Sequence, residues 1–348
     1  MAERPVHLVG SIPLEDAATV FREAGRRLGD RLARIPDGET GIRRNWISWQ
    51  HRLFAEQEAL VVSEAKEREY QLGPPFRLAP GRGADDMAFG ELGYARAAAA
   101  SWRDFTAAVE EGAVPESCRF QVCLPTPFAP VYSFVAYRDQ GAVAPLYEAR
   151  MLAELAEICR TVPATRLAVQ WDVATEMSIF EGLFPLPFLG EAPERALIER
   201  IARLGDAVPA EVELGFHLCY GDMNHRHWKE PEDTAVLVRI ANAIAASVAR
   251  PIDWIHIPVP RERDDDAYFA PLAGLALDPG TRLHLGLVHF TDGIAGARRR
   301  IAAAERVVSG FGIATECGFG RRDPETVLSL LDLHRAIAGG SGEAGRES

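Results

Sequence analysis

Short apolar runs alternate along the chain with longer stretches in which apolar residues recur every three or four positions. Apolar runs of about four to eight residues are typical of buried strands, and the three-to-four spacing predicts amphipathic helices. The expected strands are residues 7–11, 119–124, 166–172, 212–216, 252–257, 282–288 and 312–316, and the expected helices are residues 14–32, 45–53, 90–111, 145–161, 193–207, 232–249, 295–309 and 324–338. This alternation predicts an α/β fold with a parallel sheet.

Roughly eight strand–helix units follow one another without an internal break, which predicts a TIM (β/α)8 barrel formed as a single domain by residues 1–338. Pro and Gly cluster near residues 58–90, so this segment is expected to be an insertion or lid. Residues 339–348 are rich in Gly, Ser and Glu and are expected to be a disordered tail. A doubly wound open sheet would give a similar alternation and is the alternative fold.

The composition narrows the classes of partner. The chain has 348 residues, a formal charge of −12 and no basic stripe, which argues against nucleic acid and anionic membranes. No apolar run is long enough to span a bilayer, and the first residues show no signal-peptide pattern. The five cysteines are too widely spread for a disulfide framework, so a reducing cytoplasm is the expected location. An acidic chain of this size is compatible with a monomer or a homodimer.

Polar residues stand at or just after the ends of the apolar runs. In a parallel barrel the carboxyl ends of all strands meet on one face, where the active site lies. The residues in such positions are Ser11, Glu39, Asp172, His217, Cys219, His289 and Cys317. We expect this set to contain the functional side chains. No Gly-rich phosphate-binding loop supports nucleotide binding.

His217 and Cys219 are the main candidates for metal binding. Residues two apart on a strand point to the same side, so an imidazole nitrogen and a thiol sulfur would aim at one point. Cys317 ends another apolar run and is the expected third ligand. Three protein ligands leave one position of a tetrahedral zinc ion open, as in catalytic zinc sites. The alternative is that all three are small buried core residues.

Five short motifs in this order suggest a family. The chain resembles the catalytic half of cobalamin-independent methionine synthase, in the barrel superfamily that also contains uroporphyrinogen decarboxylase. The motifs are Val9-Gly10-Ser11, Asp37-Gly38-Glu39, Gln170-Trp171-Asp172, His217-Leu218-Cys219 and Glu316-Cys317-Gly318-Phe319, the last followed by Arg322. The resemblance covers most of the chain but depends on short segments, and five together are more specific than any one alone.

The resemblance implies a role for each motif. Gly10 and Ser11 match the segment that holds the carboxylate of homocysteine, and Glu39 and Asp172 match the residues that bind its amine. The metal ligands implied are His217, Cys219 and Cys317, and the further substrate-binding residues implied are Asp37 and Arg322.

Other segments depart from the family pattern. Pro258 falls where the family has a Glu as fourth zinc ligand, so His256 or another carboxylate replaces it, three protein ligands suffice, or no zinc binds. His289 stands where the family has an Asp, and Thr291 where it has its general-acid His. The segment that contacts the folate methyl donor is not recognisable. The thiol side therefore looks retained and the donor side changed.

These observations predict a zinc-dependent methyl or alkyl transferase that acts on homocysteine or a similar small amino thiol, as in methionine biosynthesis. Its expected partners are a small-molecule thiol and an alkyl donor. Asp172 and His289 are the candidate catalytic residues, with His289 able to protonate the leaving group because His titrates near neutrality. One alternative is a metal-free decarboxylase or lyase that uses Asp37, Glu39, Asp172 and Arg322 on a carboxylate substrate. The other is a non-catalytic binding protein.

Overall fold

The computed structural model describes residues 4–64, 72–183, 187–221 and 227–339. Of the expected tail at residues 339–348, only Gly339 is described; residues 340–348 lie outside the described residues, as does part of the expected insertion. Within the described part, no helix is both long and apolar enough to cross a bilayer.

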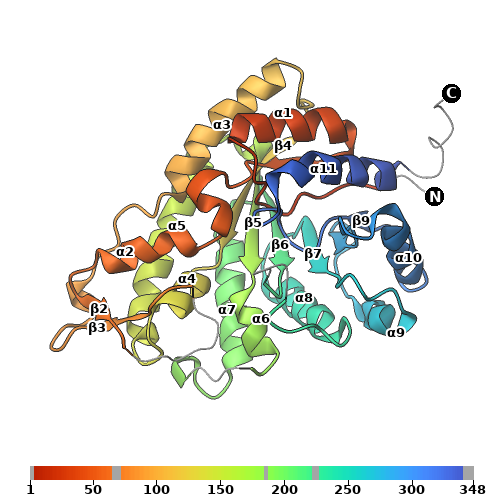
Figure 1. The fold of residues 1–348 in the computed structure, drawn as a ribbon. Helices are drawn as coiled ribbons and strands as arrows, with labels where there is room; N and C mark the ends of the chain where they lie inside the picture. The colour runs from red at the N-terminus through yellow and green to blue at the C-terminus, as the bar shows by residue number, and fades with distance from the viewer. Residues whose placement is uncertain (1–3, 65–71, 184–186, 222–226, 340–348) are drawn as a thin grey trace, which may run out of the picture.

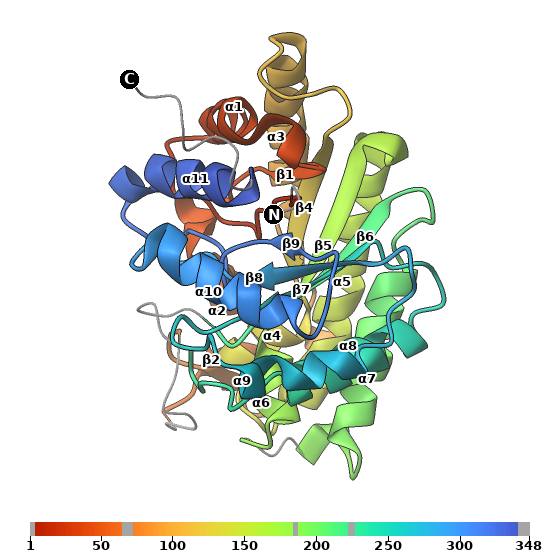
Figure 2. The same cartoon turned by 90° about the vertical axis from the view of Figure 1, so that its right-hand side faces the viewer.

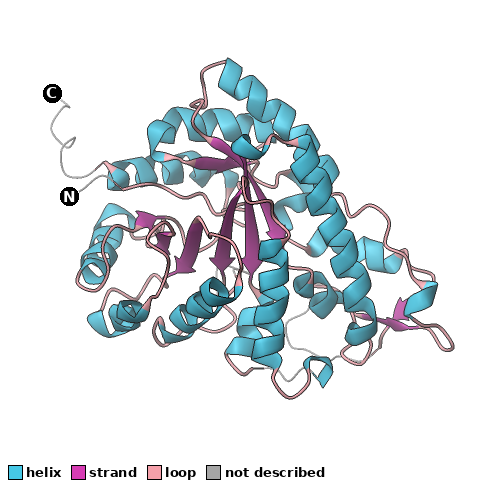
Figure 3. Cartoon of the chain, turned by 180° about the vertical axis from the view of Figure 1, so that it is seen from behind, coloured by secondary structure: helices cyan, strands magenta, loops and turns pink. Residues whose placement is uncertain are grey.

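A curled, seven-stranded parallel sheet forms the centre of the molecule, with helices packed around it (Figures 1 and 3). The strand order is β1-β4-β5-β6-β7-β8-β9, so neighbours in the sheet follow one another along the chain. The strands are β1 Arg34–Pro36, β4 Arg119–Pro125, β5 Leu167–Val173, β6 Glu213–Leu218, β7 Trp254–Pro258, β8 Arg282–Gly286 and β9 Gly312–Ile313. The predicted α/β class with a parallel sheet is confirmed.

Helices connect the strands on the outside of the sheet (Figure 2). The longer ones are α1 Ala17–Leu28, α3 Tyr94–Glu110, α5 Gln140–Thr161, α7 Pro193–Asp206, α8 Ala235–Ser247, α10 Gly293–Glu305 and α11 Pro324–Ala338. Short helices are α2 His51–Ala55, α4 Phe128–Phe134, α6 Thr175–Phe180 and α9 Asp266–Phe269. The sequence pattern did not predict α4 or α6, because helices of about two turns or fewer are too short for a periodicity to stand out.

The expected strand at residues 7–11 is not a regular strand. Only Val6 pairs, through isolated parallel bridges to Leu32 and Ile313 beside the two edges of the main sheet. Beyond it, side-chain amides take the place of a backbone ladder. The Gln121 Nε2 donates to the Leu8 carbonyl at 3.0 Å and the Gln170 Nε2 donates to the Val9 carbonyl at 2.6 Å.

Two segments differ from the predicted pattern near the start of the sheet. The sequence pattern predicts no strand between residues 33 and 44, but Arg34–Pro36 form β1, with Ile35 paired in parallel to Phe120 of β4. The strand is short because Pro36 has no N–H to continue the ladder. The expected insertion near residues 58–90 contains the separate antiparallel strands β2 Leu60–Val62 and β3 Phe76–Leu78. This small sheet lies at the edge of the molecule, apart from the main sheet (Figure 1).

A side chain at Gly215 of β6 would collide with the core of the sheet. A Cβ built there would lie 1.9 Å from Cε2 of Trp254, which is fully buried. We therefore expect Gly215→Ala to lower the free energy of unfolding by about 1–3 kcal/mol, the range for overpacking a core. Chemical denaturation measures it, with Gly280→Ala as the control because nothing lies within 4 Å of its Cβ position. Equal stability of the two variants would contradict the expected close packing.

Candidate functional site

A cavity of about 450 Å³ opens at the carboxyl ends of the strands. It is lined by Val9, Gly10, Ser11, Glu39, Arg44, Trp46, Leu72, Tyr132, Ser133, Asp172, Ala174, Thr175, Ser178, Leu183, His217, Cys219, Gly221, Trp228, Cys317, Gly318 and Arg321. Most of the predicted site residues are therefore in one place. The parallel pairing explains this, because Asp172 of β5 lies directly beside His217 of β6.

His217, Cys219 and Cys317 converge in the cavity wall, with their potential ligand atoms all within 4.8 Å of one another. The Sγ atoms of Cys219 and Cys317 are 3.6 Å apart. Two thiolates on one tetrahedral zinc ion, each about 2.3 Å from the metal, would be separated by about 3.8 Å. A disulfide would require about 2.05 Å. The spacing of the two sulfurs therefore fits a shared metal ion.

The His217 ring also fits a metal site. Its Nε2 is buried and has no well-aligned hydrogen-bond partner among the described residues, although the Cys219 thiol lies close to the ring, and its Nδ1 lies 2.7 Å from Nδ1 of His256. Buried polar atoms are rarely left unpaired, and a metal ion beside the two sulfurs would satisfy this nitrogen. Together with two thiols as the other donors, this makes the set suitable for zinc.

The thiol of Cys219 is prepared for ionisation. Cys317, within hydrogen-bonding distance, lowers the pKa of Cys219 well below its usual range; burial opposes this, and His217 contributes in the same direction as Cys317. The backbone N–H of Gly221 also donates to the Cys219 sulfur at 3.3 Å. A thiolate is the form that binds metals.

Two carboxylates line the same cavity. Burial, followed by the neighbouring Asp172, raises the pKa of Glu39 well above its usual range. Burial likewise raises the pKa of Asp172 to about 6, although His217 and a hydrogen bond from Gln170 oppose the shift. The Gln170 Nε2 donates to Asp172 Oδ1 at 2.9 Å and so orients that carboxylate. A cation bound between the two groups would relieve their repulsion.

Asp37 does not line the cavity and instead holds Glu39 in position. Glu39 has a φ of 47°, a left-handed conformation that is costly for a residue with a side chain. Its N–H donates to Asp37 Oδ1 at 2.9 Å, and Asp37 also accepts from Arg43 at 2.6 Å and from Ser101 at 2.8 Å. Burial favours a raised pKa for Asp37, but these partners outweigh it and lower the pKa.

The first and last motifs pack directly against each other. The Phe319 N–H donates to the Ser11 carbonyl at 2.6 Å, and the Gly320 N–H donates to Ser11 Oγ at 3.1 Å. A Cβ at Gly318 would lie 2.4 Å from Ser11 Oγ, so the close approach requires glycine there. Gly10 and Ser11 therefore lie in the cavity wall next to the segment that carries Cys317.

His289 and Arg322 line a neighbouring cavity of about 580 Å³ rather than the first one. The His289 Nε2 donates to the Val259 carbonyl at 2.9 Å, and its Nδ1 lies 3.5 Å from the Glu316 carboxylate. Burial, followed by the charge of Arg300, lowers the pKa of His289 to about 3. Arg322 lies 3.8 Å from Glu316. The two cavities lie on either side of one segment, because Glu316 lines the second cavity and the next residue, Cys317, lines the first.

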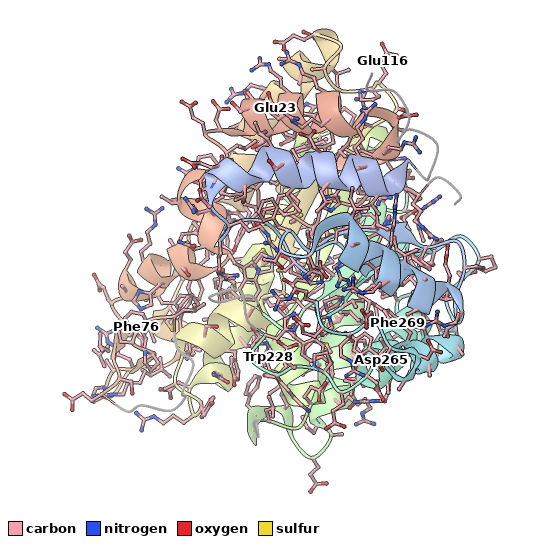
Figure 4. All side chains as sticks on the ribbon, turned by 45° about the vertical axis from the view of Figure 1, so that its right-hand side comes forward. Glu23, Phe76, Glu116, Trp228, Asp265 and Phe269 are labelled. Atoms are coloured by element: carbon pink, nitrogen blue, oxygen red, sulfur yellow. The ribbon has the colours of Figure 1, made fainter. Side chains whose placement is uncertain are left out.

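Sequence reasoning missed several residues of the cavity wall. These are Arg44, Tyr132, Trp228 and Arg321. Tyr132 lies on α4, which no periodicity revealed, and Trp228, labelled in Figure 4, follows residues outside the described part. Arg321 stands two residues after Phe319, so its closeness to a motif was the only available signal. These residues add aromatic surface and positive charge to the cavity.

The raised pKa of Asp172 makes stability depend on pH. Because this pKa moves from 3.8 to about 6 on folding, the folded state holds the proton more tightly. The free energy of unfolding should fall as the pH rises from about 4 to about 6, by on the order of 3 kcal/mol from this group. Asp172→Asn should flatten the fall, as measured by chemical denaturation of metal-free protein.

The control is Glu116→Gln, whose side chain is exposed and lies well away from Trp228 in Figure 4. It should keep the wild-type pH profile. A profile unchanged in Asp172→Asn would show that Asp172 titrates as an ordinary exposed carboxyl group.

Comparison with known proteins identifies the fold. No family model and no curated protein sequence matches this chain. A B12-independent methionine synthase from Shewanella sp. W3-18-1, solved with selenomethionine, is 14% identical, covers 97% of each chain and superposes with a TM-score of 0.64. A putative vitamin-B12-independent methionine synthase from Listeria monocytogenes is 17% identical, with a TM-score of 0.54 and coverage of 97% of this chain and 98% of that one.

A methyltransferase from Methanosarcina mazei is similar as well, at 10% identity and a TM-score of 0.52, with coverage of 97% of this chain and 94% of that one. At such identities the likeness concerns the fold, and it extends over nearly the whole of each chain. The predicted resemblance is therefore confirmed at this level: the chain has the fold of the B12-independent methionine synthase structures and of this methyltransferase.

Proposed function

We propose that this protein is a zinc-dependent transferase that moves a methyl or related alkyl group to or from the thiol of homocysteine or a similar small amino thiol. The observation that carries the proposal is the convergence of His217, Cys219 and Cys317 in a cavity that also contains two carboxylates. Methyltransferases with the same fold support the reaction class.

In this proposal, His217, Cys219 and Cys317 hold the zinc ion. Bound zinc would supply a Lewis acid that keeps a coordinated substrate sulfur ionised at neutral pH. Pro258 offers no ligand atom where a fourth ligand is expected, and both ring nitrogens of His256 are already engaged. Three protein ligands then leave room for the substrate sulfur.

Glu39 and Asp172 bind the substrate amine. An ammonium group between them would form charge-assisted hydrogen bonds and return both carboxylates to their ionised forms. The substrate carboxylate is assigned to Gly10 and Ser11, beside the segment that carries Cys317. Holding both ends of a small amino thiol aims its sulfur, and such positioning can lower a barrier by several kcal/mol.

The alkyl donor occupies the rest of the cavity. Its wall includes the apolar or aromatic side chains of Trp46, Tyr132, Leu183 and Trp228. The segment that contacts the folate methyl donor is not recognisable in the sequence before Arg119, so we propose a donor other than the usual polyglutamylated folate. The contacts and low pKa of His289 favour a structural role over general-acid catalysis. Asp172 remains the proposed catalytic carboxylate because it lies beside the metal ligands.

The proposal also covers the architecture of the domain. Val6 bridges to both sides of the main sheet, which supports closure into an eight-stranded TIM barrel. Residues 1–338 would then form one domain, acting as a monomer or homodimer in the cytoplasm. A metal-free decarboxylase receives less support, since two of its four proposed residues, Asp37 and Arg322, do not line the cavity.

Metal analysis tests the proposal directly. We expect about one zinc ion per chain in the tag-free protein. His217→Ala, Cys219→Ser and Cys317→Ser should each lose the metal together with alkyl transfer to thiols. Cys159 is a free cysteine that does not line the cavity, so Cys159→Ser should retain both the metal and the alkyl transfer. A folded wild-type protein prepared without chelator that contains no zinc, or full activity in His217→Ala and Cys317→Ser, would rule the proposal out.

Substrate analogues test the role assigned to Glu39. Glu39→Gln should weaken binding of homocysteine by about 10- to 100-fold, because a hydrogen bond to a charged group contributes about 1.5–3 kcal/mol. Binding of 4-mercaptobutyrate, which lacks the amine, should change little. Titration calorimetry gives both constants, with Glu116→Gln as the control because Glu116 is exposed and lines neither cavity. Equal weakening of both ligands would contradict an amine-binding role.

A further inference from the structure

Four buried histidines lie close together inside the curled sheet, and one of them, His217, also lines the cavity. They are His7, His217, His256 and His284. Their rings are close, with centroids 4.7 Å apart for His217 and His256 and 4.9 Å apart for His7 and His284. Among the described residues, the only hydrogen bond within this group joins His217 to His256. His256 pairs with His217 in the β6–β7 register, one strand away.

The hydrogen bonds determine which nitrogens carry protons. The His256 Nε2 lies 3.0 Å from the Thr315 carbonyl, which can only accept, so this nitrogen carries the proton. A neutral imidazole carries a single proton, so a His256 ring that donates from Nε2 accepts at Nδ1. The proton in the 2.7 Å contact belongs to His217 Nδ1, and the opposite nitrogen, Nε2, faces the cysteines.

Thr315 connects His256 to the segment that carries Cys317, another of the proposed metal ligands. Its hydroxyl donates to the Cys317 carbonyl at 2.6 Å, and its own carbonyl accepts from His256. His256 thus connects the strand that carries His217 to the segment that carries Cys317. Both of its nitrogens are engaged by these contacts, so it is not itself available as a ligand.

We propose that His256 is a positioning residue that holds His217 with its Nε2 toward Cys219 and Cys317. The expected effect on metal affinity rests on the proposed zinc site. The orientation of His217 rests only on the hydrogen bonds described above. A partner of this kind fixes the tautomer and the ring orientation of a metal-binding histidine, and losing it typically costs 10- to 100-fold in metal affinity. Because Pro258 offers no ligand atom, only three protein ligands are proposed. The orientation of His217 therefore matters more for metal binding.

The metal arm of the test measures zinc affinity by competition with a chromophoric chelator. His256→Leu should bind one zinc ion about 10- to 100-fold more weakly than wild type. His256→Gln should recover much of the loss, because its amide can accept from His217 and donate to Thr315 at the same time. His284→Leu is the matched control, because His284 lies beside His256 in the β7–β8 register and neither of its ring nitrogens has a hydrogen-bond partner among the described residues. Equal affinity of folded His256→Leu and wild type would overturn the proposal.

The second arm needs no metal. In metal-free protein labelled with ¹⁵N-histidine, NMR should show a nitrogen–nitrogen coupling across the hydrogen bond between His217 and His256, with the proton on His217. Assigned signals without this coupling, or with the proton on His256 Nδ1, would overturn the proposal. If wild type binds no zinc while the coupling is present, the proposed function fails and the positioning contact stands.

Discussion

The parallel register of β5, β6 and β7 is the constraint on which the site depends. It sets Asp172 beside His217 and His217 beside His256, so a carboxylate, a candidate metal ligand and its hydrogen-bond partner lie in adjacent strands. Side chains at the carboxyl ends of parallel strands share one face, and a slip of one residue would turn each to the other side. The close fit of Gly215 against Trp254 opposes such a slip.

Polar groups support the site from below. Gln170 donates to both the Val9 carbonyl and Asp172, and its oxygen faces His7 at 3.0 Å. The first motif and the central carboxylate are thus held by one buried amide. A polar network in a low-dielectric interior is rigid when its members are paired. This arrangement holds the segment after Val6 in place without a regular strand ladder.

The carboxylates in and beside the cavity differ in whether a positive charge compensates them. Glu39 and Asp172 repel each other when ionised, and burial adds to the cost, so both carboxyl groups have raised pKa values that a bound cation would lower. Asp37 follows the opposite logic because Arg43 neutralises it, and it serves to hold Glu39 in a strained conformation. Two nearby carboxylates of one motif therefore have different tasks, set by their partners.

Sequence alone determined the alternation of strands and helices and the placement of His217, Cys219, Cys317, Glu39 and Asp172 at strand ends, because periodicity and spacing are local properties of a chain. The tertiary structure decided which residues from different strands and loops come together. It placed His289 in the second cavity, and it brought Arg44 and Arg321 into the wall of the first. It also placed Asp37 where it accepts a hydrogen bond from the Glu39 backbone and holds that residue. It also joined His256 to His217. Contacts between residues distant in sequence depend on strand register and loop packing, which no local pattern encodes.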